Sequence, residues 1–531
     1  MKWLSQRSLC SLVSCALTLL LPLALAAQQP QPAPIPGINQ GQGQGNQGGN
    51  QFGGLFGGGN QGGAAQADFD SLIDLITSTV EADSWMENGT GDGELQPFPT
   101  GVYADAAGTL RFSAPAETSL ASLTSTALPT AIKPIAEAIQ QNVRQASDLR
   151  FVSLPRLQKV IHNRQLAHQP LEEEMLTLAG LQRVEYVFVV PPTAESPGDL
   201  ILAGPAGDWR VRPDGKIVST QFDQPIVRLD DLIVLWRRHL LREGKAFGVS
   251  INPRQENLAK VQNYVARTNA KPIEPSERRQ WLDGLQASLG KQDVEFFGIE
   301  PDSHVARVLL VADYHMKLIG MGIAEGVDGV VSYLKSVKVG RDGSVPPMTV
   351  LRWWFAMNYQ PVETNAERTV FALRGPGAKV LSENELLAAR GQRVHTGQSE
   401  DLNKQYADSF TDNFGEISSK YPLYTELRNV FDLSMVLAIV EREGLLERVG
   451  WRPELFANSD WLPLPKMRVP SEVETVVNHR VVRRKHIIAG ISGGVWIDTR
   501  ETLNVEAGST VSEELKAAPK SAESSEVWWW D

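Results

Sequence analysis

Hydrophobic residues are most concentrated in residues 303–323, SHVARVLLVADYHMKLIGMGI. Ser303 is a suitable helix N-cap, and the apolar side chains that follow fall on nearly every face of a helix. Such a helix is normally buried by its neighbours. It also carries more ionisable side chains than a membrane span tolerates, namely Arg307, Asp313, His315 and Lys317. We therefore predict a central core helix that ends at the glycines after residue 319, followed by a short helix in residues 330–337.

The same periodicities run through most of the chain. Helical spacing predicts helices over residues 131–147, 154–167, 171–181, 229–243, 257–268, 276–289 and 401–443, the last broken near Pro422. Alternating or short apolar runs predict strands at residues 184–190, 199–205, 247–251, 294–299, 351–358, 368–375, 378–382 and 472–497. Helices mixed with hairpin-connected strands indicate an α+β fold rather than a doubly wound parallel sheet. Residues 303–323 are expected to lie at its centre.

The first 27 residues have the pattern of a signal peptide. Lys2 and Arg7 precede an apolar run, and the small residues of Ala24-Leu25-Ala26 provide a cleavage site. Residues 12–15, LVSC, resemble a lipoprotein box, which leaves lipidation of Cys15 as an alternative. The apolar run continues well beyond Cys15, and this favours an ordinary signal peptide. We therefore predict a periplasmic, cell-surface or extracellular protein.

Removal of the signal peptide changes the cysteine content and the net charge of the chain. The two cysteines, Cys10 and Cys15, lie in the leader, so the mature chain has no disulfide and no cysteine metal site. Of the 51 basic residues, Lys2 and Arg7 lie there too, which leaves 49 against 62 acidic residues and a net charge of −13. An acidic chain argues against nucleic-acid binding, which needs a basic surface. No transmembrane segment is predicted in the mature chain.

Composition also divides the chain into regions. Residues 28–66, rich in Gly, Gln and Asn, predict a disordered tether, with self-association through Phe52, Leu55 and Phe56 as the alternative. Residues 67–113 predict a small α+β module, whose acidic turn lacks the spacing of a calcium-binding loop. Residues 114–499 predict one large α+β region, or two subdomains divided near residue 300. Residues 500–531 predict a disordered tail that ends in a tryptophan cluster.

Gly490-Ile491-Ser492-Gly493-Gly494 matches the nucleophile elbow G-x-S-x-G. That motif requires a helix after the serine and a catalytic histidine later in the chain. Residues 495–505 instead resemble strand or coil, and all eight histidines precede Ser492. A glycine-rich turn or bulge therefore accounts for the motif better than a nucleophile does. A serine hydrolase remains the alternative, because catalytic triads are defined by geometry and not by order.

The sequence shows no ligand set for a metal ion or cofactor. His162 and His168 are six residues apart, and no H-x-x-x-H or H-E-x-x-H pair occurs. We therefore assign no metal ligand, no cofactor and no catalytic residue.

Two features remain as candidates for binding a ligand or partner. Asp313 and Lys317 form an i, i+4 pair on the central helix, and His315 projects the other way; a structural ion pair or a polar pocket would explain them. Trp528, Trp529 and Trp530 follow a polar tail that offers them no core. A partner groove or a membrane interface would suit these tryptophans.

Several motifs occur in an order that resembles a known family. They are VEYVFVVPP, LILAGPAGDW, VADYHMKLIGMG, GVVSYL, RWWFAMNYQPV, FALRGPGAKVL and FTDNFGEISSKYPLYTELRNVFDLSMVLAIVE. Over about residues 120–496 the chain is similar to a domain-of-unknown-function family of exported planctomycete proteins. Residues 68–98 are similar to a short unit that recurs in other exported proteins of these bacteria. The resemblance implies export and an intact domain, and it transfers no catalytic residue.

We therefore interpret the sequence as an exported, non-enzymatic binding or scaffold protein of the cell envelope. An envelope protein or a cell-surface polymer would be its partner. The alternative is an extracytoplasmic hydrolase with a site near the central helix or Ser492.

Overall fold

A computed structural model describes residues 94–98, 101–105, 142–212, 215–242, 246–268, 277–338, 350–482, 485–507 and 527–531. The predicted signal peptide, the tether and most of the predicted helix at 131–147 lie outside these ranges. Residues 142–147 are described, and the helix prediction is wrong there, because they form a turn and the first residue of β3 (Ser147–Ser153). Two short strands of the small module are described, β1 (Glu94–Phe98) and β2 (Gly101–Asp105), and they pair antiparallel. All described residues belong to one compact unit, residues 61–531.

The described helices follow most of the predicted ones. They are α2 (Leu154–Leu166), α3 (Glu173–Leu176), η4 (Leu178–Gly180), α4 (Leu229–Arg242), α5 (Gln255–Thr268), α6 (Arg278–Leu289), α7 (His304–Gly320), α8 (Tyr333–Ser336), η5 (Ala389–Gly391), α9 (Asp401–Asp412), α10 (Phe414–Lys420), α11 (Pro422–Arg442), α12 (Leu445–Val449), α13 (Glu454–Ala457) and α14 (Thr499–Thr502). The single helix predicted over residues 171–181 is wrong. Leu178 and Ala179 have φ values of 47° and 57°, and this left-handed backbone separates α3 from η4.

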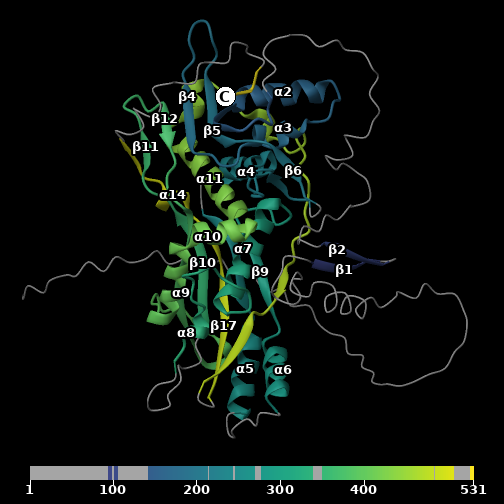
Figure 1. Cartoon of the computed structure of the whole chain (residues 1–531), viewed down its shortest axis with the longest axis vertical. Helices are drawn as coiled ribbons and strands as arrows, with labels where there is room; N and C mark the ends of the chain where they lie inside the picture. The colour runs from purple at the N-terminus through teal and green to yellow at the C-terminus, as the bar shows by residue number, and fades with distance from the viewer. Residues whose placement is uncertain are drawn as a thin grey trace, which may run out of the picture. The chain divides into compact units, whose positions relative to one another are not determined.

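The strands form two large sheets in the described part of the chain (Figure 1). The eight-stranded sheet has the order β14 (Arg393–Val394), β13 (Gly377–Leu387), β10 (Val350–Asn358), β17 (Lys485–Ile497), β8 (Phe247–Pro253), β9 (Lys291–Phe297) and β15 (Glu472–Glu474), and β16 (Val477–Val482) also pairs with β17. The seven-stranded sheet has the order β18 (Val505–Ala507), β11 (Val362–Thr364), β12 (Val370–Ala372), β4 (Tyr186–Val190), β5 (Asp199–Ala206), β3 (Ser147–Ser153) and β19 (Trp529–Trp530). A hairpin of β6 (Trp209–Val211) and β7 (Ile217–Ser219) stands apart from both sheets.

Most of these strand pairs are antiparallel, whereas β10 with β17 and β11 with β18 are parallel. Helices and largely antiparallel sheets together confirm the predicted α+β class. None of the helices in the described residues combines the length and hydropathy that a membrane crossing requires.

The predicted central helix is confirmed. Ser303 caps α7, its side chain accepting a hydrogen bond from the amide of Ala306 at 3.1 Å. Thirteen of the residues of α7 are buried, and they lie on all faces of the helix. In Figure 1, α7 and α11 lie side by side in the middle of the described structure, and α7 also packs on β17, β8 and β10. The eight-stranded sheet is therefore covered on one face by the most apolar helices of the chain.

The predicted disordered tail is wrong at residues 500–507, which contain most of α14 and the strand β18, and at residues 527–531. Trp529 and Trp530 form β19, which pairs antiparallel with β3, and Trp528 and Trp530 are buried. The expectation failed because it treated the tryptophans as part of the polar tail before them, whereas they pair with the edge of β3, which lies far away in the sequence. Residues 508–526 lie outside the described ranges.

Candidate metal centre on the polar face of the eight-stranded sheet

The two faces of the eight-stranded sheet differ in polarity. On β10, Leu351, Trp353 and Phe355 are fully buried, and they alternate with half-buried Arg352 and Trp354. Trp353 and Phe355 contact aromatic rings of α9, such as Tyr406 and Phe410. Because side chains alternate along a strand, Arg352 points to the opposite face. That face is polar.

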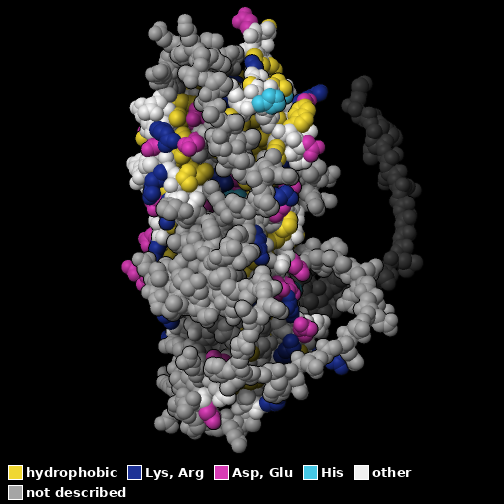
Figure 2. Space-filling view, turned by 90° about the vertical axis from the view of Figure 1, so that its right-hand side faces the viewer, with side chains coloured by type: hydrophobic (Ala, Val, Ile, Leu, Met, Phe, Trp, Pro, Cys, Tyr) yellow, Lys and Arg dark blue, Asp and Glu magenta, His cyan; other side chains and the backbone are white. Residues whose placement is uncertain are grey.

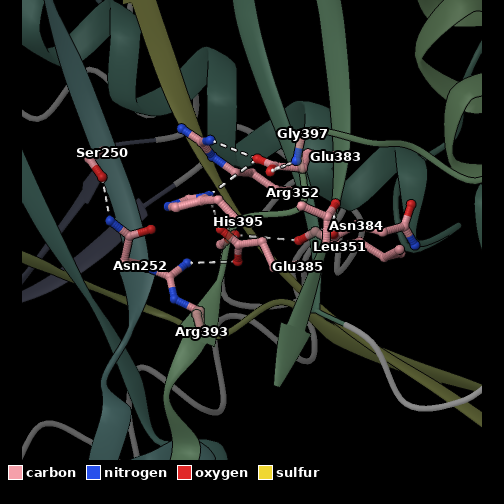
Figure 3. Close-up of polar contacts among 12 residues, drawn as sticks. Ser250, Asn252, Leu351, Arg352, Glu383, Asn384, Glu385, Arg393, His395 and Gly397 are labelled. Atoms are coloured by element: carbon pink, nitrogen blue, oxygen red, sulfur yellow. Dashed lines mark hydrogen bonds and ion pairs between the residues drawn. The ribbon is translucent and has the colours of Figure 1, made fainter. Parts of the chain in front are cut away.

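Cross-strand register places charged groups next to one another on the polar face. Arg352 lies opposite Glu383 of β13 on one side and Ser492 of β17 on the other. Glu385, two residues after Glu383, points to the same face. The chain then turns through η5 into β14, so His395 returns to these carboxylates. Figure 3 shows His395 between Glu383 and Glu385, with Arg352 and Arg393 flanking them.

Glu383 is held in its ionised form. Its Oε1 accepts the amide N–H of Gly397 at 2.8 Å, and its Oε2 accepts a guanidinium N–H of Arg352 at 3.0 Å. His395 Nδ1 lies 3.3 Å from the same Oε2. Burial acts to raise the pKa of Glu383, but these donors outweigh it and place the pKa below its ordinary value.

Glu385 is fully buried and only half satisfied. Its Oε2 accepts hydrogen bonds from Arg393 at 3.0 Å and from the Ser492 hydroxyl at 3.1 Å. Its Oε1 has no hydrogen-bond partner, although His395 Nδ1 lies 3.2 Å away. A buried acceptor without a partner is unfavourable and uncommon in folded proteins. Oε1 of Glu385 points toward the imidazole of His395, so both groups are directed to the same position, where a metal ion could bind.

The geometry suits a metal ion. One ligand atom from each of Glu383, Glu385 and His395 lies within 4.8 Å of the others. With metal–ligand bonds of about 2.1 Å, neighbouring ligands lie about 3.0 Å apart in an octahedral site and about 3.4 Å apart in a tetrahedral one. The 3.2 and 3.3 Å separations from His395 to the carboxylates fall in this range. Imidazole and carboxylate together favour zinc, iron or manganese over magnesium or calcium.

The sequence analysis did not identify this ligand set because the three residues do not form a known metal-binding motif. They come together only through the pairing of neighbouring strands. The available signal was Glu383-Asn384-Glu385 at strand spacing, followed by a turn and His395. The predicted strand, however, stopped at residue 382, which left the two glutamates in a loop.

Ser492 belongs to this cluster, but not as an activated nucleophile. It is fully buried and donates to Glu385, and no histidine among the described residues is its hydrogen-bond partner. The predicted turn or bulge at Gly490–Gly494 is wrong, because β17 continues through it. β17 continues to Ile497, so no helix directly follows Ser492, but the strand or coil expected over residues 495–505 is wrong at α14 (Thr499–Thr502).

Asp313 and Lys317 lie under the other face of the sheet. Their Oδ2 and Nζ atoms are 2.7 Å apart, and both side chains are fully buried. Burial raises the pKa of Asp313, and Lys317 and the amide of Gly494 oppose it; burial likewise lowers the pKa of Lys317 against the attraction of Asp313. The geometry is that of a buried ion pair.

His315 is directed elsewhere, to the Tyr424 hydroxyl at 2.9 Å and the Tyr421 ring. The predicted candidates on α7 are therefore not brought together in one site.

A second polar cluster surrounds the start of α7. His304 Nδ1 lies 2.9 Å from Asp231, and Arg228 makes two hydrogen bonds to Asp230. Glu426 of α11 lies 3.9 Å from both His304 and Lys216. Because each charge has an opposite neighbour, this cluster fixes α4, α7 and α11 to one another.

The second cluster predicts an acid dependence of stability. Burial opposes ionisation of Asp230, but Arg228 and His304 outweigh it and lower the pKa from 3.8 to about 2. A depressed pKa means stability that is present above pH 3.8 and lost as the pH falls towards 2, a loss of about 2 kcal/mol. Urea unfolding between pH 2 and 5 should show this decline in the unmodified chain and a shallower one in Asp230→Asn. Equal slopes would contradict the assignment.

One face of the described structure is mixed in charge (Figure 2). On the face drawn in Figure 2, acidic and basic side chains of the described residues are interspersed rather than separated by sign.

A family model described as a protein of unknown function, DUF1598, matches residues 249–333. The match runs from β8 through α7 to the start of α8, so it includes Asn252, Asp313 and Lys317. Glu383, Glu385 and His395 lie outside it. No curated protein matches the chain significantly, and neither does any solved structure. The resemblance to a domain of unknown function is therefore confirmed for residues 249–333, and its wider extent and its planctomycete origin stay predictions.

Proposed function

We propose that this chain is an exported, non-enzymatic binding protein of the cell envelope, and that it binds a divalent transition-metal ion. Glu383, Glu385 and His395 would be the ligands. The observation that carries the proposal is the fully buried Glu385 Oε1, which has no hydrogen-bond partner and faces His395. The export part of the proposal is supported by the pattern of residues 1–27.

The residues around the ligands support metal binding. Arg352 binds Glu383, and both Arg393 and Ser492 bind Oε2 of Glu385, so the glutamates are fixed before any ion arrives. Such outer contacts orient metal ligands and are needed for affinity. The two guanidinium groups also offset the two carboxylate charges, which reduces the attraction for a cation. We therefore expect moderate affinity, consistent with reversible binding.

A metal-dependent hydrolase is the second candidate. Three protein ligands leave a coordination position for water, as catalytic zinc sites do. Ser492 would then act only through Glu385, because its hydroxyl is buried and already donates to that carboxylate.

Metal binding can be tested directly with the full chain. After removal of metal ions, calorimetric titration with Zn²⁺ or Mn²⁺ should give saturable binding of about one equivalent, and Mg²⁺ should bind far more weakly. Glu385→Gln and His395→Ala should each weaken binding at least about 100-fold, because each removes a ligand. A Zn²⁺ concentration 100 times the dissociation constant should also stabilise the unmodified chain by about 2.7 kcal/mol.

The controls are exposed residues of the same types. Glu454→Gln and His168→Ala should bind like the unmodified chain, since both positions are exposed and remote from the cluster in sequence. If no transition-metal ion binds at about one equivalent, or if Glu385→Gln binds as well as the control variants, the proposed function is wrong.

A further inference from the structure

Residues 527–531, VWWWD, bind to the rest of the chain as a short peptide binds to a sheet edge. Trp529 and Trp530 pair antiparallel with Val152 and Phe151 of β3, and the Ser153 amide donates to the Trp528 carbonyl at 2.8 Å. β19 is the edge strand of the seven-stranded sheet. Strand addition of this kind obtains affinity from backbone hydrogen bonds and specificity from side-chain sites.

The tryptophans provide those side-chain contacts. Trp528 lies within the large core cluster, and Trp529 packs against it. Trp530 joins a separate cluster, where its ring stacks on Phe151 at 5.7 Å between centroids. The guanidinium of Arg156 lies over Trp530, 5.3 Å from the ring centroid. Both faces of the sheet edge therefore hold an indole.

Arg150 provides a charged end to the site. It is fully buried, and its Nε and Nη2 atoms donate to the two carboxylate oxygens of Asp531 at 2.7 and 2.9 Å. Its remaining donors bind the backbone carbonyls of Val143, Ala179 and Gln145. Its guanidinium also lies 4.8 Å from the centroid of the Trp529 ring. Because its other hydrogen bonds go to carbonyls within residues 143–179, these bonds hold the arginine independently of the segment that it binds.

We propose that the edge of β3, with Arg150 and Arg156, is an exchangeable peptide-binding site for a Trp-Trp-Asp strand. Its ligand is the 527–531 segment, supplied by the same chain or by a second copy. The contacts that hold this segment on β3, Arg150 and Arg156 are non-covalent.

The chain length permits this exchange. β18 ends at Ala507 on the opposite edge of the same sheet, about 29 Å from β19 at the usual strand spacing. The 20 residue steps from Ala507 to Val527 span up to about 68 Å. A connection with this number of residues can reach β3 of its own copy or of a second copy, and the two modes of binding compete as the concentration of the chain rises.

Cysteine trapping tests the exchange. The amide of Ser153 bonds to Trp528, so Val152 and Trp529 are a non-hydrogen-bonded pair, whose side chains lie closest. The chain has only two cysteines, Cys10 and Cys15, which are replaced by serine. One full-length copy then carries Val152→Cys and the other Trp529→Cys. Mixing them under mild oxidation should give a disulfide heterodimer at least ten times more abundant than with a copy carrying Val211→Cys, an exposed position.

A synthetic peptide makes the test independent of how well the Trp529→Cys copy folds. The hexapeptide EVWCWD, residues 526–531 with cysteine in place of Trp529, should form a mixed disulfide with the Val152→Cys copy and not with the Val211→Cys copy. Excess unmodified EVWWWD should reduce both the peptide adduct and the heterodimer about ten-fold. Equal labelling of the two copies, no labelling, or a peptide adduct without any heterodimer would overturn exchange between copies. Metal binding is unaffected by either result.

Discussion

Replacing Lys317 by methionine should lower the free energy of unfolding by about 3–5 kcal/mol at pH 7.5. The substitution nearly preserves volume, but it leaves the carboxylate of Asp313 fully buried without its cation. Removing one partner of a buried ion pair is strongly destabilising because the remaining charge is uncompensated. Chemical unfolding of the full chain, followed by tryptophan fluorescence, measures the change.

The loss in Lys317→Met should depend on pH. Burial already raises the pKa of Asp313 above 3.8, and without the ammonium group the pKa should rise further. A raised pKa means that the penalty is absent below 3.8, where the carboxyl is protonated in both states, and grows as the pH rises through the folded-state pKa. The variant should therefore be much closer to the unmodified chain at pH 4 than at pH 7.5.

The double variant Asp313→Asn/Lys317→Met is the matched control. It removes both charges, so it should recover at least half of the stability that Lys317→Met loses. A loss that is the same at both pH values, or that the double variant does not reduce, would show that packing and not charge explains the effect. Unchanged metal binding in these variants would also separate α7 from the proposed metal centre.

The fold could be predicted where local pattern determines the outcome. In α7, Ser303 supplies the cap and apolar residues cover every face, so both the helix and its burial follow from the sequence. The helix predicted at 171–181 is wrong because the backbone at Leu178 and Ala179 is left-handed, a conformation that the pattern of apolar residues does not reveal.

The candidate sites could not be predicted, because they depend on strands that are distant in sequence. Glu385 meets Ser492 only because β10 lies between β13 and β17, and His395 meets Glu383 only because the chain turns back after β13. Asp531 is bound by Arg150, 381 positions earlier. Such pairings are set by topology and register, which hydrophobic periodicity along a single segment does not encode.

The second large effect is expected for Gly493→Ala, which should lower the free energy of unfolding by about 3 kcal/mol. Gly493 lies opposite Trp353, and an added Cβ would stand only 1.7 Å from the Trp353 carbonyl oxygen and 3.1 Å from Lys317 Cε. The carbonyl belongs to the middle of β10, so relief requires the separation of two central strands. Overpacking in a well-packed core typically costs about 1–3 kcal/mol, and backbone displacement places this case at the upper end.

Gly415→Ala gives the comparison. Gly415 is exposed in the first turn of α10, and apart from its chain neighbours and the backbone of its own helix no atom lies within 4 Å of the added methyl group. Its replacement should therefore leave stability unchanged or raise it by up to about 1 kcal/mol. If Gly493→Ala is equally neutral in urea unfolding, β10 and β17 do not approach each other as closely as the structure shows. A large loss of stability would explain the glycines beside Ser492 by close strand packing, without any catalytic elbow. They would be there because β10 and β17 meet over the Asp313–Lys317 pair, where no side chain fits.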